Sequence, residues 1–148
     1  MPTPEQNKSL AESFVKEVFN NHNIQFAQDS LAEDFIDHEV APGITPDKQG
    51  AITWFTKMFT AIPDSRAEIQ HMIASGDRVV MHSTFSGTDT GGFMPGVPAT
   101  GKSFEMGGID IMRVNDQGKF AEHWGIQDQM SMMGQLGLLP PPPETHEH

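Results

Sequence analysis

The spacing of apolar residues changes from a helical to a strand period close to Ala67, and this change limits the folds open to the chain. Before it, Leu10, Phe14 and Val18 recur at helical spacing, whereas after it apolar and polar residues alternate as they do in strands. Helices first and strands afterwards are typical of an α+β domain and not of a parallel, doubly wound fold. We therefore expect N-terminal helices packed against an antiparallel sheet.

Three helices are expected before the change of period, bounded by prolines or by small polar residues that cap helix N-termini. Their expected limits are from after Thr3-Pro4 through Phe19, from Ser30 to Phe35 with Ser30 as N-cap, and from Pro46 or Asp47 to the residue before Pro63. The Asp37-His38-Glu39 triplet, after the second helix, opens a loop.

Four strands are expected after the change of period, in two antiparallel pairs. Their expected limits are from Ala67 to the Ser75-Gly76-Asp77 turn, from Arg78 to Ser86, from Lys102 to Val114, and from Lys119 to about Asp128. The segment from Gly87 to Gly101 is rich in Gly, Pro and Thr, which predicts a long loop of the kind that often carries function. A short helix from Ser131 to Leu136 is expected last.

The length of 148 residues fits one domain, which we expect over residues 1–139, with residues 140–148 as a flexible, proline-rich tail. The net charge of -11 disfavours nucleic acid and anionic membranes as partners. No apolar run approaches the roughly 20 residues of a membrane span. The absence of Cys excludes thiolate chemistry and fits a reducing compartment, so a cytoplasmic location is expected.

Motifs that hold metals, nucleotides or acyl groups are missing from the sequence. There is no His-Glu-x-x-His helix, and the run from Gly87 to Gly92 lacks the spacing of a phosphate-binding loop. There is also no Gly-x-Ser-x-Gly elbow to present a nucleophilic serine. We therefore expect neither a metal nor a cofactor.

His123 and Asp110 are the candidate catalytic residues. Alternation places His123 on one face of the last strand and Asp110 on one face of the preceding strand, so the two meet if the hairpin register allows it. A carboxylate that orients an imidazole makes a competent general acid or base, because His titrates near neutral pH. The alternative is a buried Asp–His pair with a structural role only.

Other side chains are expected to line an apolar pocket on the concave face of the sheet and to bind a small hydrophobic molecule. These candidate substrate-binding residues are His38, His82, Trp54, Phe93, Met106, Gln127 and Asp128. For His38 and His82 the alternative is a core histidine whose hydrogen bonds are satisfied. By alternation Asp128 faces away from His123 unless a bulge intervenes. Phe93 belongs to an apolar loop segment that could cap a flat ligand.

The run Gly118-Lys119-Phe120-Ala121-Glu122-His123-Trp124, followed by Asp128 and by Gln135-Leu136-Gly137, resembles the signature of SnoaL-like polyketide cyclases and the related ester cyclases. The resemblance implies the nuclear transport factor 2-like fold, a cystatin-like cone in which a curved antiparallel sheet wraps around N-terminal helices. It also implies a homodimer formed through the open sheet face. Cyclases of this type close a ring by intramolecular aldol condensation of a polyketide ester, without a cofactor, using a carboxylate as acid and base.

The sequence departs from this pattern at Gly125. In the aldol-closing members the key Asp lies two residues after the strand's His, at the position of Gly125, and a Gln and a His precede it at the positions of Gly108 and Asp110. Two functions are therefore open. One is cofactor-independent cyclase or isomerase chemistry on a small hydrophobic carbonyl compound, with Asp110 and His123 moving protons; the other is non-catalytic binding of a small molecule. A third, epoxide hydrolysis by an Asp–Arg–Asp cluster, has only three arginines to draw on: Arg66, Arg78 and Arg113.

Overall fold

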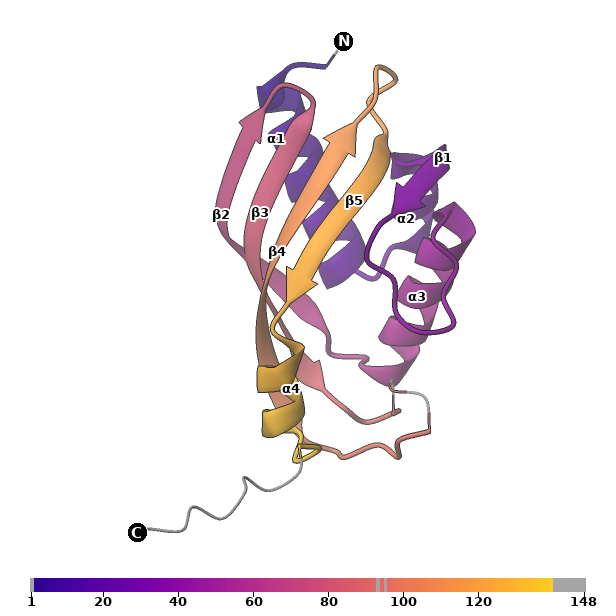
Figure 1. The fold of residues 1–148 in the computed structure, drawn as a ribbon, viewed down its shortest axis with the longest axis vertical. Coiled ribbons are helices and arrows are strands. Elements are labelled where there is room, and N and C mark those ends of the chain that lie inside the picture. Colours follow the sequence, from indigo (N-terminus) through magenta and orange to yellow (C-terminus); the bar gives the residue numbers. More distant parts are fainter. Residues whose placement is uncertain (1, 93, 95, 140–148) are drawn as a thin grey trace, which may run out of the picture.

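The N-terminal helices form one layer and a sheet forms the other, and a short C-terminal helix follows the last strand (Figure 1). The computed structural model describes residues 2–92, 94 and 96–139. These residues form α1 (Pro4–Phe14), the π-helical segment η1 (Val15–Asn20), α2 (Ile24–Ser30), β1 (Leu31–Asp37), α3 (Lys48–Ala61), β2 (Arg66–Ser75), β3 (Arg78–Thr88), β4 (Ser103–Val114), β5 (Phe120–Gln127) and α4 (Gln129–Gln135). The expected α+β class is confirmed.

The sheet of the described residues has five strands in the order β1-β5-β4-β3-β2. The two expected hairpins, β2–β3 and β4–β5, are present and antiparallel, and β3 also pairs antiparallel with β4. β1 adds a fifth strand that runs parallel to β5. The sheet is therefore mixed, whereas the sequence predicted an antiparallel one.

The helix expected from Ser30 to Phe35 is wrong. That segment belongs to strand β1, and the helix before it, α2, is capped by Asn23, whose side chain accepts a hydrogen bond from the backbone N–H of Phe26. Ser30 closes this helix, since its Oγ donates to the carbonyl of Phe26. Short apolar segments fit a helix or a strand equally well, and here the pairing with β5 decides, because it buries Leu31 and Phe35.

The other two expected N-terminal helices are present, but the first, expected to run through Phe19, is α-helical only to Phe14 and continues as the π-helical segment η1. Asp47 caps α3 by accepting a hydrogen bond from the backbone N–H of Gly50 at 2.8 Å, and the helix ends at Ala61. Thr3 begins α1 with a capping box shared with Gln6. No helix among the described residues is long and apolar enough to cross a membrane.

The two faces of the sheet differ in what covers them. The inner face carries buried residues such as Met81, Phe85 and Met112, which belong to cores shared with the N-terminal helices. In the larger core, Phe120 meets Phe14 edge to face at 5.3 Å between ring centroids. The outer face carries exposed apolar side chains instead: Ile73 is 68% exposed, Ile109 52% and Ile126 79%.

Candidate active site

Three strands bring the candidate catalytic residues together on the inner face of the sheet. In the β4–β5 register, Met112 lies opposite His123 and Asp110 lies opposite Gly125, so Asp110 is a diagonal neighbour of His123. On the other side of β5, the parallel strand β1 ends at Asp37, directly opposite His123. The imidazole therefore stands between two carboxylates from different strands.

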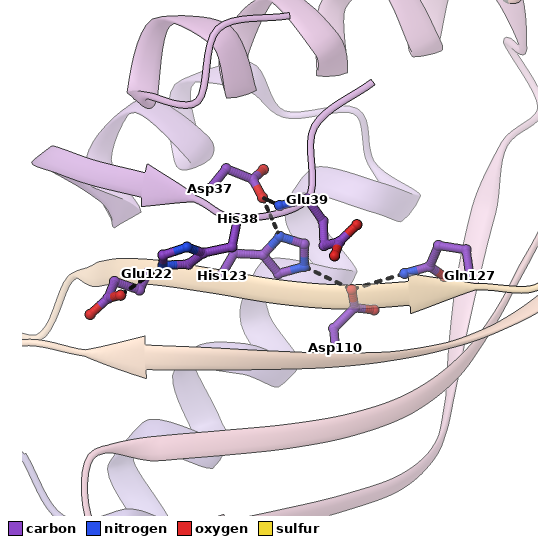
Figure 2. Close-up of polar contacts among 7 residues, drawn as sticks. All are labelled: Asp37, His38, Glu39, Asp110, Glu122, His123 and Gln127. Carbon is purple, nitrogen blue, oxygen red and sulfur yellow. Dashed lines mark hydrogen bonds and ion pairs between the residues drawn. The ribbon is translucent and has the colours of Figure 1, made fainter. Parts of the chain in front are cut away.

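Both ring nitrogens of His123 are engaged by these carboxylates (Figure 2). Nε2 lies 2.8 Å from Oδ1 of Asp110, and Nδ1 lies 2.9 Å from Oδ1 of Asp37. The three side chains are between 17% and 20% exposed, so water screens the pairs only in part. The backbone N–H of Glu39 also donates to Oδ1 of Asp37, which holds that carboxylate in place.

The two carboxylates set the charge of His123. Burial of the ring lowers the pKa, but the hydrogen bonds that the ring donates to the carboxylates of Asp110 and Asp37, together with the negative charges of these groups, outweigh burial and raise the pKa to about 9. At neutral pH the ring is therefore an imidazolium that donates from both nitrogens. It is not free to act as a base itself, and the groups able to accept a proton here are the carboxylates.

Two glycines make room for the polar groups of this cluster. A Cβ on Gly125 would collide with Oδ1 of Asp110, so the Asp110 carboxylate fills the space beside residue 125. A Cβ on Gly108 would collide with the side-chain amide of Gln127, which lies over the backbone of β4. Gln127 in turn donates from Nε2 to Oδ1 of Asp110 at 3.0 Å.

The expected contact between Asp110 and His123 is present, while Asp37 was not predicted as its second partner. The sequence feature that could have indicated a role for Asp37 is the polar triplet Asp37-His38-Glu39, which directly follows an apolar segment. Because that segment was interpreted as a helix, its pairing with β5, and hence the position of Asp37 beside His123, could not be seen.

His38 lies away from this cluster, on the outer face. Its ring stacks on Trp124 at 4.7 Å between centroids, and its Nε2 lies 2.8 Å from a carboxylate oxygen of Glu122. Arg113 donates to the other oxygen of Glu122, and the hydrogen bonds from His38 and Arg113 lower the pKa of that carboxyl group. His38 is thus part of an outer-face network and does not face Asp110.

His82 also lies on the outer face. It pairs with Ile109 of β4 and stacks on His71 of β2, with 5.4 Å between ring centroids. Alternation along β3 sends the neighbouring Met81 to the inner face, so His82 cannot join the cluster around His123.

The remaining candidates take several positions. Trp54 and Met106 are half-buried and pack against the cores on the inner side of the sheet. Asp128 caps α4 by accepting a hydrogen bond from the backbone N–H of Ser131 at 3.1 Å, which gives it a structural role. Phe93 lies outside the described residues.

No arginine of the described chain stands in the cluster. Arg78 lies over the ring of Trp124 and Arg113 pairs with Glu122, both on the outer face. Within the described residues, no group of three or more His, Asp or Glu side chains is arranged to hold a metal ion. Two surface hollows, of about 440 and 450 Å³, lie beside the β4–β5 turn and are lined by neither His123 nor Asp110. The apolar pocket at the cluster therefore stays a prediction.

Comparison with known proteins agrees with this architecture. The solved structure of TsrD from Streptomyces laurentii matches with a TM-score of 0.83 and 26% identity, over 94% of this chain and 100% of that one. IdmH, a proposed polyketide cyclase from Streptomyces antibioticus, matches with a TM-score of 0.75 and 30% identity, over 89% of this chain and 99% of that one.

An LEH-like epoxide hydrolase from M. tuberculosis shares the fold alone, with a TM-score of 0.68 and 15% identity over 91% of this chain and 92% of that one. A comparison with curated proteins found no match. The family model described as SnoaL-like polyketide cyclase matches residues 9–136. The chain therefore belongs to the SnoaL-like polyketide cyclase family.

Proposed function

We propose that this protein is a cofactor-independent enzyme of the cyclase or isomerase type, which acts on a small hydrophobic carbonyl compound. Asp110 is the base that removes a proton next to the carbonyl, and His123 is the cation that holds Asp110 in position. Asp37 fixes the second nitrogen of the ring. The apolar binding site expected on the inner face, near Trp54 and Met106, is part of the proposal.

One observation carries this proposal: the carboxylate of Asp110 occupies the space that Gly125 leaves open beside His123. The aldol-closing cyclases that the sequence resembles bear their key Asp at the position of Gly125. Because Asp110 and Gly125 are directly opposite in the register of β4 and β5, a carboxylate from β4 reaches the same region. In this proposal, Asp110 of strand β4 takes the place of the Asp that is missing at position 125.

The proposed chemistry needs only proton transfers. Asp110 takes a proton from the carbon next to the substrate carbonyl, and the electrons of the broken C–H bond form an enolate. In a cyclisation, the enolate carbon bonds to a second carbonyl carbon of the same molecule, and the resulting alkoxide takes the proton back from Asp110. In an isomerisation, the proton returns to a different carbon. Holding both ends of one substrate in contact supplies much of the rate.

The alternative is a binding protein that keeps the fold without turnover. Gly125 favours it, because this glycine replaces the family's acid and base. The engagement of both nitrogens of His123 also suits a purely structural cluster. In that case, removing the charge of Asp110 would change stability but no reaction rate.

Deuterium exchange of the methyl protons of acetophenone, a small aryl ketone, tests the proposal in D2O by proton NMR. We expect the wild type to exceed the buffer rate, and Asp110→Asn and His123→Gln to return to it. Asp116→Asn, which removes a carboxylate in the turn after β4, is the matched control and should keep the wild-type rate. Ligand-dependent shifts in the spectrum without any exchange would support the binding protein and contradict the enzyme.

Two further expectations belong to this proposal. The exposed isoleucines Ile73, Ile109 and Ile126 support the expected homodimer, since they would be covered if two outer faces pair. A cytoplasmic location stays a prediction from the absence of cysteine.

A further inference from the structure

We propose that Gln127 is a positioning residue that fixes Asp110 for proton transfer. We also propose that residue 108 must be a glycine, so that the amide of Gln127 has room to reach Asp110. This inference rests on the proposed function, because it assigns a role to a residue next to the proposed base. It replaces the expectation that Gln127 binds substrate.

The contact of Gln127 is with the base itself. Its Nε2 donates to Oδ1 of Asp110 at 3.0 Å, the same oxygen that accepts from Nε2 of His123 at 2.8 Å. Figure 2 shows the two donors reaching Asp110 from opposite sides. Both come from β5, on the face that alternation gives to residues 123, 125 and 127.

The amide of Gln127 occupies the place that a side chain at residue 108 would take. Gly108 lies opposite Gln127 in the strand register, and a Cβ at Gly108 would collide with Oε1 and the amide carbon, with the amide nitrogen at 3.1 Å. The neighbouring Gly107 differs, because a Cβ there meets nothing within 4 Å. Only position 108 therefore needs a glycine for the amide to reach Asp110.

Two donors on one oxygen determine which oxygen reacts. Oδ1 of Asp110 is occupied, while Oδ2 has no hydrogen-bond partner among the described residues. A carboxylate fixed through Oδ1 presents Oδ2 in one orientation, and such fixing lowers the entropy lost on reaching the transition state. Without Gln127 the carboxylate is held by His123 alone and can rotate, which weakens its ion pair with the ring.

The first test measures the pKa of His123 by NMR in Gln127→Leu and Gly108→Ala. Both changes remove the amide from Asp110, the first by deletion and the second by displacement. We expect the pKa to fall below the wild-type value of about 9 in both, and to fall further in Asp110→Asn, which removes one of the two carboxylates that raise it. Gly107→Ala is the matched control and should keep the wild-type value. An unchanged or higher pKa in Gln127→Leu overturns the positioning role of Gln127. An unchanged pKa in Gly108→Ala overturns the claim that a glycine is needed at residue 108.

The second test separates this inference from the proposed function. With acetophenone at saturation, we expect Gln127→Leu to lower the exchange rate about 10-fold while the half-saturating concentration stays the same. A rise in that concentration alone would return Gln127 to substrate binding and overturn the inference. Full exchange activity in Asp110→Asn would instead refute the proposed function, whereas the NMR result on His123 would still stand.

Discussion

Raising the pH from about 6 to about 10 should destabilise this protein mainly through His123. Folding raises the pKa of this residue from 6.5 to about 9, so the folded state binds the proton more tightly than the unfolded chain does. Such a group stabilises the folded state fully at pH values below its pKa in the unfolded chain. This contribution is lost as the pH rises through its pKa in the folded state. The difference corresponds to a loss of about 3 kcal/mol in the free energy of unfolding.

Urea unfolding followed by tryptophan fluorescence measures this loss, since Trp54 and Trp124 report on two parts of the molecule. The composition suits the experiment: the chain has no Cys and no Tyr, two side chains that would otherwise titrate in the upper part of this pH range. His123→Gln should be less stable at pH 6 and should lose most of the pH dependence. His71→Gln is the matched control, because His71 is an outer-face histidine whose described side-chain contact is the ring of His82.

Two results would refute this reasoning. One is an equal pH dependence in the wild type and in His123→Gln. The other, which does not require the variant to fold, is a His123 pKa at or below 6.5 in an NMR titration of the wild type. Either would mean that the two carboxylates do not hold the ring as an imidazolium.

Two further predictions concern packing. Phe120→Ala should lower the free energy of unfolding by about 3 to 5 kcal/mol, because Phe120 is 1% exposed and meets Phe14 edge to face. Urea unfolding at neutral pH measures this loss, and a loss under about 1 kcal/mol would contradict the described core. Ile126→Glu should convert a dimer into monomers in sedimentation velocity, since it puts a charge into the proposed outer-face contact. A wild type that sediments as a monomer, or a variant that stays dimeric, would refute pairing through this face.

Much of the site could be predicted from alternation alone. Residues two apart on a strand share a face, and the turn of residues 115–119 between β4 and β5 brings the faces of Asp110 and His123 together. Alternation does not show, however, which face of a strand packs against the helices when both faces carry apolar residues. His82 was assigned to the pocket for this reason, although its register with Ile109 places it on the outer face.

Asp37 could not be predicted because its position depends on a contact between distant parts of the chain. The segment from Leu31 to Asp37 has no strict alternation, and only its parallel pairing with β5 makes it a strand. The spacing of residues within a segment cannot show this parallel pairing, because β1 and β5 are far apart along the chain. The second carboxylate at His123 therefore appears only in three dimensions.

The pairing of Asp110 with Gly125 shows how a side chain on one strand can occupy the space beside a motif position on the neighbouring strand. Residues opposite each other on neighbouring strands share one patch of the sheet surface, so a functional group can come from either strand if the partner is small. Here each polar side chain faces a glycine: Asp110 faces Gly125, and Gln127 faces Gly108. Both pairings are needed, because the first gives the carboxylate its place beside His123 and the second lets the amide hold it there. Gly125→Asp should therefore lower the deuterium exchange of acetophenone to the buffer rate, since a second carboxylate at that position would compete with Asp110 for the same space.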